Sequence, residues 1–215
     1  MTLLRVDASI QGPRSAGSAL ADRVLDRFTA ARPDVSVVRR HLGQEPLPAT
    51  AWADAIAGSF APEADRSDAQ REALALAEQL AGELQGATGA VLALPFYNFG
   101  VSQHVKTWFD LALAGAPHGA RLLDGTPVVA VLTRGGAYGS GTPREGWDHS
   151  SDYLRRVLVD VWGADLTLVE REFTLVGVQP ALDAFTELAA ELKATAEREA
   201  FEHGRWLLGD RRAAA

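Results

Sequence analysis

The sequence predicts an α/β fold in which a parallel, doubly wound sheet lies between two layers of helices. Five apolar segments typical of strands alternate with amphipathic segments typical of helices along 215 residues. The central segment, Ala90–Leu94, is apolar throughout, as expected for a strand buried on both faces of a parallel sheet. A hydrophobic content of 47% supports one core, so we expect a single domain over residues 1–215.

The predicted strands are, in chain order, Leu3–Ala8, Val35–Arg40, Ala90–Leu94, Pro127–Leu132 and Leu166–Glu170. Apolar residues spaced by three and four predict helices over Ser15–Ala31, Ser67–Leu84, Val101–Ala114, Ser150–Trp162 and Gln179–Leu208. A long connection with three prolines, Gln44–Pro62, contains a short predicted helix near Trp52–Ile56.

Five parallel strands suit the flavodoxin-like three-layer sandwich with strand order 2-1-3-4-5. Strand 3 then lies between strands 1 and 4, and the carboxyl ends of these three strands are neighbours. The loops that leave them are Ser9–Ser18, Pro95–Gly100 and Thr133–Gly141. Because α/β proteins bind ligands at this edge, we expect the three loops to form one site.

The first loop combines hydroxyl groups and glycines at the start of a helix. Free backbone N–H groups and the helix dipole favour a phosphate there, and Ser15 suits both the N-cap and the phosphate contact. Neither a Gly-x-Gly-x-x-Gly dinucleotide motif nor a P-loop is present. An ordinary capped helix is the alternative interpretation.

The second loop, Phe96-Tyr97-Asn98-Phe99, holds three aromatic residues among four, whereas aromatics make up 7% of the chain. It suits a flat, partly polar ring, with Asn98 as a hydrogen-bonding partner; simple packing and a turn role for Asn98 are the alternative. In the third loop, Gly135 and Gly136 allow the backbone to approach a ligand closely, and Arg134 is expected either there or paired with a carboxylate across the turn.

Several function classes find no support in the sequence. A net charge of −7 argues against sequence-independent nucleic-acid binding, and the absence of cysteine excludes thiol chemistry. The five histidines lack metal-ligand spacing, and no Gly-x-Ser-x-Gly motif marks a hydrolase. With neither a membrane-length apolar segment nor a secretory signal, we expect a cytoplasmic protein. A phosphate loop beside aromatics, with few ionisable groups, suggests that a cofactor carries the reaction.

The motif Pro95-Phe96-Tyr97-Asn98-Phe99, followed by Val101–Asp110, resembles the FMN-dependent NADH:azo-compound and quinone oxidoreductases, which carry Pro-Met-Tyr-Asn-Phe. Thr133-Arg134-Gly135-Gly136 is similar to their Ser-Arg-Gly-Gly, and Ser9 with Ser15–Ser18 is similar to their phosphate loop. The likeness runs from Leu3 to about Gly163. Three departures are Phe96 in place of methionine, Gly17 where serine is common, and a short segment 115–125 without the family's Phe-x-Tyr.

The resemblance implies a homodimer with FMN at the interface and a two-step cycle, in which NADH or NADPH reduces FMN before a quinone or azo compound is reduced. The cofactor-binding residues it implies are Ser9, Ser15, Ala16, Gly17 and Ser18 at the phosphate and Phe96, Tyr97, Asn98, Phe99, Thr133, Arg134, Gly135 and Gly136 at the ring. Tyr138 is expected on the substrate side. An electron carrier without a substrate pocket and a flavin-free scaffold remain as alternatives.

Overall fold

The computed structural model describes residues 1–209 and has the predicted architecture. The parallel strands are β1 (Thr2–Asp7), β2 (Ser36–His41), β3 (Gly89–Tyr97), β5 (Pro127–Thr133) and β6 (Asp165–Arg171). Their order is β2-β1-β3-β5-β6, which is the predicted order 2-1-3-4-5. The addition is β4 (Gly100–Val101), which pairs antiparallel with the end of β3. The flavodoxin-like prediction is therefore confirmed.

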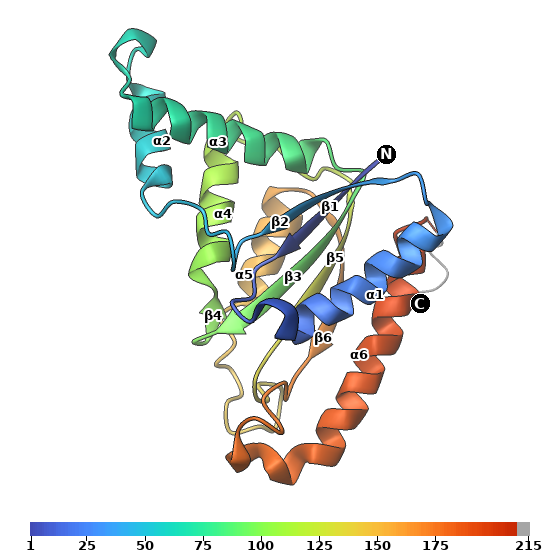
Figure 1. The fold of residues 1–215 in the computed structure, drawn as a ribbon. Coiled ribbons are helices and arrows are strands. Elements are labelled where there is room, and N and C mark those ends of the chain that lie inside the picture. The colour runs from blue at the N-terminus through green and yellow to red at the C-terminus, as the bar shows by residue number, and fades with distance from the viewer. Residues whose placement is uncertain (210–215) are drawn as a thin grey trace.

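The helices cover both faces of the sheet. They are α1 (Ala16–Ala31), α2 (Ala51–Phe60), α3 (Asp68–Gln85), α4 (Gln103–Ala114), α5 (Ser151–Arg155) and α6 (Thr186–Trp206), with short turns η1 (Gly12–Arg14), η2 (Glu63–Asp65), η3 (Arg156–Val161) and η4 (Pro180–Phe185). Figure 1 shows α1 and α6 on one face and α3, α4 and α5 on the other. Two apolar clusters fill the layers, one on each face of the sheet.

Three predicted helices differ in detail from the observed ones. The helix predicted to begin at Val101 begins at Gln103, because Val101 pairs with Phe96 in β4. The helix predicted over 150–162 is an α-helix only through Arg155, after which η3 continues it as a wider π-helical turn. The last helix begins at Thr186 rather than Gln179, because Pro180 starts the separate 3-10 turn η4. This turn places the residues before α6 below the carboxyl edge of the sheet, where they become part of the site (Figure 1).

Serine side chains fix where three of the helices begin. Ser15 caps α1 and Ser102 caps α4, each accepting a backbone N–H three residues later, and Ser67 forms a complete capping box with Gln70 at α3. Over residues 1–209, no helix combines the length and apolar character needed to cross a membrane. In the same range, no group of three or more histidine and carboxylate side chains is arranged to hold a metal ion.

Candidate functional site

The three predicted loops meet at the carboxyl edge of the sheet and enclose two adjoining cavities. The smaller has a volume of about 270 Å³ and lies beside the loop after β1. The larger has a volume of about 880 Å³ and lies between the β3–β4 hairpin, the loop after β5 and the segment before α6. Phe96, Tyr97, Gly135 and Leu175 line both cavities, so the two form one continuous site.

The smaller cavity is a polar pocket at the N-terminus of α1. Ser9, Ser15 and Ala16, which were expected at a phosphate, line it together with Thr133, which was expected at the ring. The Ser9 hydroxyl lies 3.3 Å from the Tyr97 hydroxyl and accepts the N–H of Gln11 at 3.2 Å. These contacts join the loop to Tyr97 at the end of β3.

Backbone amides at the start of α1 supply further donors to this pocket. Ser15 Oγ accepts the Ser18 N–H at 3.1 Å, whereas the N–H groups of Ala16 and Gly17 come too early in the helix to have an intrahelical acceptor. A Cβ on Gly17 would lie 3.3 Å from Thr133 Oγ1, so α1 approaches β5 closely here. Free amides, hydroxyls and the helix dipole together suit a phosphate group.

A buried ion pair supports this loop from beneath. Arg5, which is 1% exposed, donates to both carboxylate oxygens of Asp7 at 2.7 and 2.8 Å and to the Ser18 carbonyl oxygen at 3.0 Å. Burial raises the pKa of Asp7, but hydrogen bonds and the Arg5 charge outweigh it, so the pKa lies below its usual value. The first turn of α1 is therefore fastened to β1 by a charged contact.

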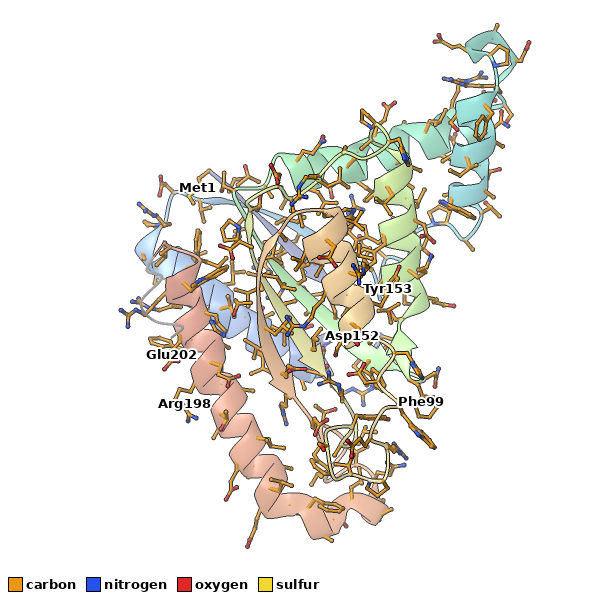
Figure 2. All side chains as sticks on the ribbon, turned by 180° about the vertical axis from the view of Figure 1, so that it is seen from behind. Met1, Phe99, Asp152, Tyr153, Arg198 and Glu202 are labelled. Carbon is orange, nitrogen blue, oxygen red and sulfur yellow. The ribbon has the colours of Figure 1, made fainter. Side chains whose placement is uncertain are left out.

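The hairpin between β3 and β4 presents the predicted aromatic residues. Tyr97 pairs with Gly100, and the two residues between them have positive φ, 48° at Asn98 and 71° at Phe99. Non-glycine residues seldom adopt this region, and such strain concentrates at functional sites. The Phe99 carbonyl accepts the His149 N–H at 3.0 Å, while the residue as a whole is 41% exposed (Figure 2).

The larger cavity is mostly aromatic and aliphatic. The Phe96 and Tyr138 rings meet edge to face with centroids 4.6 Å apart, and the Phe99 centroid lies 6.4 Å from that of Tyr138. The predicted residues that line it are Phe96, Tyr97, Asn98, Phe99, Gly135, Gly136 and Tyr138. A cavity of this size and composition suits a flat aromatic ligand together with a second small molecule.

Arg134 lies beside the larger cavity without lining it. Its guanidinium donates to Asp148 Oδ2 at 2.7 Å, to Glu170 Oε1 at 2.8 Å and to Ser151 Oγ at 2.6 Å. Burial lowers the pKa of Arg134, but its bonds to the two carboxylates raise it above its ordinary value. Of the two expectations for Arg134, the structure shows the one in which it pairs with carboxylates. Its side chain joins the two ends of the loop that contains Gly135, Gly136 and Tyr138.

Two other predicted residues lie next to the site without lining it. Gly17 and Ser18 do not line either cavity; Gly17 packs against Thr133, and the Ser18 hydroxyl is buried near Asp7.

The loop that follows β2 contacts the loop after β1 at Gly43. A Cβ on Gly43 would lie 2.2 Å from the Ser9 carbonyl oxygen, so only glycine allows the two loops to touch here.

The structure adds residues that the sequence did not single out. Gln11 and Arg14 line the smaller pocket, and Arg14 is its one cation among the described residues. Its position one residue before the Ser15 N-cap was the signal that could have found it. The larger cavity also has a wall from the segment after β6 and the start of α6, namely Glu172, Phe173, Leu175, Gln179, Leu182, Phe185, Leu188 and Leu192. No motif marks this wall.

The arrangement selects for one kind of ligand. A polar pocket with a cation, hydroxyls and free amides suits a phosphate, and the adjoining cavity suits a planar ring. No histidine lines either cavity in the described part of the chain, and the aromatic cavity contains a single carboxylate. The site can thus bind and orient a phosphorylated aromatic cofactor, which fits the prediction that a cofactor carries the reaction.

Known proteins share this sequence and fold. A family described as having a flavodoxin-like fold matches residues 1–197. An FMN-dependent NADH:quinone oxidoreductase of Frankia alni is 38% identical over 200 residues, which cover 91% of this chain and 94% of that protein. Similar solved folds include an azoreductase from Bacillus anthracis strain Sterne, with a TM-score of 0.76, 20% identity, and 95% and 98% of the two chains covered.

An FMN-dependent NADH-azoreductase from Bacillus anthracis strain Ames Ancestor, solved in complex with FMN, is also similar. Its TM-score is 0.69 at 15% identity, with 93% of this chain and all of that chain (100%) covered. At such identities the solved structures establish the shared fold, whereas the family match and the relative from Frankia alni establish kinship. This chain belongs to the flavodoxin-like family that includes the FMN-dependent NADH:quinone oxidoreductases.

Proposed function

We propose that this protein is an FMN-dependent NADH oxidoreductase that reduces quinones and azo compounds. The observation that carries the proposal is the continuity between a phosphate-type pocket at α1 and an aromatic cavity of about 880 Å³. Both lie at the edge of the sheet where flavodoxin-like proteins hold FMN. The relatives named as FMN-dependent NADH:quinone oxidoreductases support the same assignment.

The residues present fit FMN at both of its ends. Ser9, Ser15 and Arg14, with the Ala16 amide, would hold the phosphate, since each lines the small pocket. Tyr97, Asn98 and Phe99 would border the ring from the hairpin, and Gly135 and Gly136 line the same cavity. Gly17, Ser18 and Arg134 would not contact FMN themselves; they position the loops that line the two cavities.

When bound, FMN supplies the redox centre that accepts a hydride from NADH and passes electrons to the quinone or azo acceptor. The protein's own part is to bind, orient and exclude water. Asn98, held at the strained tip of the hairpin, offers an amide to the polar edge of a ring. The N–H groups after β5 are suited to stabilise negative charge that develops there.

The large cavity distinguishes this assignment from a simple electron carrier. Its outer wall, formed by Tyr138, Phe173 and Phe185, gives a nicotinamide or an acceptor ring a place to pack. Donor and acceptor would occupy this space in turn, which gives a two-step cycle. NADH is the donor named for the relatives, and NADPH is the donor to compare with it.

We also propose that the protein is a cytoplasmic homodimer with the site at the interface. Apolar side chains at the mouth of the site support this part of the proposal, because Phe99, Trp147 and Phe185 are each more than two-fifths exposed. Large exposed apolar patches often mark interaction surfaces. Sedimentation at concentrations above and below the assay range tests it, and a monomer at every concentration would contradict it.

An absorbance spectrum and an NADH assay test the function. We expect purified protein to show a flavin spectrum, or to acquire one on titration with FMN, and to oxidise NADH with menadione only when FMN is bound. Plots of reciprocal rate against reciprocal NADH concentration should be parallel lines at different menadione concentrations. A protein that binds no FMN, or binds it without consuming NADH, would contradict the proposal.

A further inference from the structure

Two charged residues line the aromatic cavity among residues 1–209, and they have different surroundings. Glu172 accepts the Tyr138 N–H at 2.8 Å, so its charge is used to hold the loop after β5. Arg144 lines the same cavity from the outer part of that loop. The remaining lining is mostly aromatic and aliphatic, so Arg144 is the positive charge that a ligand in this cavity would meet.

Among the described residues, 1–209, the Arg144 guanidinium has no carboxylate partner. Its Nη1 donates to the Tyr138 hydroxyl, a neutral group, at 3.0 Å, and its Cζ lies 5.6 Å from the centroid of the Tyr138 ring. The adjacent Glu145 instead accepts from Ser140 Oγ at 3.0 Å and from the Gly141 N–H at 2.8 Å. Within residues 1–209, no carboxylate oxygen comes within 4.0 Å of the guanidinium.

The guanidinium lies at the edge of the wall that would hold a flat substrate. Tyr138 contacts it and also contacts Phe96 and Phe99. The nitrogen Nη1 lies 3.6 Å from where a Cβ on Gly136 would be, so the cation reaches the inner part of the cavity as well. A ring packed on this wall would present its substituent to the planar N–H fork of Arg144, which suits carboxylate and sulfonate groups.

We propose that Arg144 makes the enzyme selective for aromatic acceptors that carry a carboxylate or sulfonate substituent. The inference rests on the proposed function, because it names the class of acceptor used by that site. The acidic group takes no part in electron transfer and is unchanged in the product. Its role is to orient the ring through a charged hydrogen bond at the cavity mouth.

Steady-state kinetics of the FMN-loaded protein test this directly. The acceptors are 1,4-naphthoquinone and its 2-sulfonate, and the measured quantity is kcat/KM for the sulfonate divided by kcat/KM for the neutral quinone. We expect Arg144→Gln to lower this ratio about 10-fold, the loss typical of one charged hydrogen bond. Because the same two acceptors are compared in each variant, their different reduction potentials cancel.

Two variants serve as controls for charge and geometry. Arg198→Gln removes the same charge from the outer side of α6, away from the cavity (Figure 2), and should leave the ratio unchanged. Arg144→Lys keeps the charge without the planar fork, so it should restore part of the ratio. Circular dichroism and the flavin spectrum establish that each variant is folded and loaded.

Calorimetric titration adds a readout that is independent of turnover. We expect naphthalene-2-sulfonate to bind the wild-type holoprotein more tightly than naphthalene-2-sulfonamide, and Arg144→Gln to weaken the first about 10-fold more than the second. Equal effects on the two ligands would overturn the inference.

The remaining outcomes are distinguishable from one another. If the wild-type protein reduces both quinones but Arg144→Gln leaves their ratio unchanged, the selectivity inference is wrong and the proposed function stands. An unchanged ratio with a raised KM for NADH would assign Arg144 to the phosphates of the dinucleotide, which also overturns it. If the wild type reduces neither acceptor, the proposed function fails, while the calorimetric comparison still decides whether the cavity prefers an acidic ring.

Discussion

The two ends of the site are built in different ways. The phosphate end, residues 9–18, is short, has Ser9, Ser15 and Gly17 buried, and is fastened by the Arg5–Asp7 pair and by close contact with Gly43. The ring end depends on a long loop between β5 and α5, residues 134–150, whose middle is exposed and whose ends are joined by Arg134. Under the proposed function, the phosphate end holds the cofactor and the ring end determines what reacts with it.

The largest expected effect comes from crowding the phosphate end. Gly43→Ala would place a Cβ 2.2 Å from the Ser9 carbonyl oxygen, so the phosphate loop must move. We expect FMN affinity to fall at least about 100-fold and the free energy of unfolding to fall by about 3 kcal/mol. Fluorescence titration with FMN and urea unfolding measure the two quantities.

Gly115→Ala is the matched control for this substitution. Its Cβ would lie 1.9 Å from the Ala77 carbonyl oxygen, between α3 and α4 and away from both cavities. It should destabilise the fold to a similar degree while its folded fraction binds FMN normally. Equal losses of FMN affinity in both variants would show that the loop contact at Gly43 has no special role.

A smaller effect is expected from Ser15→Ala. The substitution removes the N-cap of α1, worth about 1 kcal/mol, and a hydroxyl at the phosphate pocket, so the dissociation constant for FMN should rise about 30-fold. Ser67→Ala removes an equivalent cap from α3, far from the site. It should match the loss of stability without changing FMN affinity, and a similar affinity loss there would contradict the account.

The ring end is tested by Arg134→Met. Removing the guanidinium leaves Asp148 and Glu170 without their cation, and because both are partly solvated we expect a loss of about 2 kcal/mol of stability. The KM for the acceptor should rise about 10-fold, more than the dissociation constant for FMN. Arg40→Met breaks the comparable Arg40–Glu83 pair elsewhere and should leave that KM unchanged.

The smallest effect concerns pH at the same anchor. Burial raises the pKa of Asp148, but the Ser150 and Ser151 donors and Arg134 lower it below the ordinary value of 3.8. A depressed carboxyl pKa stabilises the fold above the unfolded value and loses that effect as pH falls through the folded value. Wild-type protein should therefore lose about 1 kcal/mol more than Asp148→Asn between pH 7 and pH 3 in urea unfolding. Parallel losses in the two proteins would exclude this role for Asp148.

Sequence reasoning predicted the strand order and the loop that forms the phosphate-type pocket, because both follow from local patterns. The apolar run before Pro95, the N-cap Ser15 and the sequence Pro95–Gly100 each carry their signal within a few residues. The predicted convergence of three loops then required only the order of parallel strands. The aromatic residues of the hairpin, Phe96, Tyr97 and Phe99, were found for the same reason.

The ring end was harder to predict, because its contacts join segments that are far apart in the chain. Arg134 pairs with Glu170, 36 residues later, and the outer wall includes Phe185 and Leu192 from a segment that reads as ordinary helix. The positive φ at Phe99 has no sequence signal, since phenylalanine rarely adopts it. Tertiary pairing, rather than local propensity, determines these features.

The most direct measurement compares the affinities of the wild-type apoprotein for FMN and for riboflavin, which lacks the phosphate. If residues 9–16 hold the phosphate through several charged hydrogen bonds, FMN should bind at least about 100-fold more tightly. Ser15→Ala should reduce that ratio by raising the FMN dissociation constant alone. Affinities for the two flavins within threefold of each other would contradict the central claim that the pocket at the N-terminus of α1 binds the phosphate.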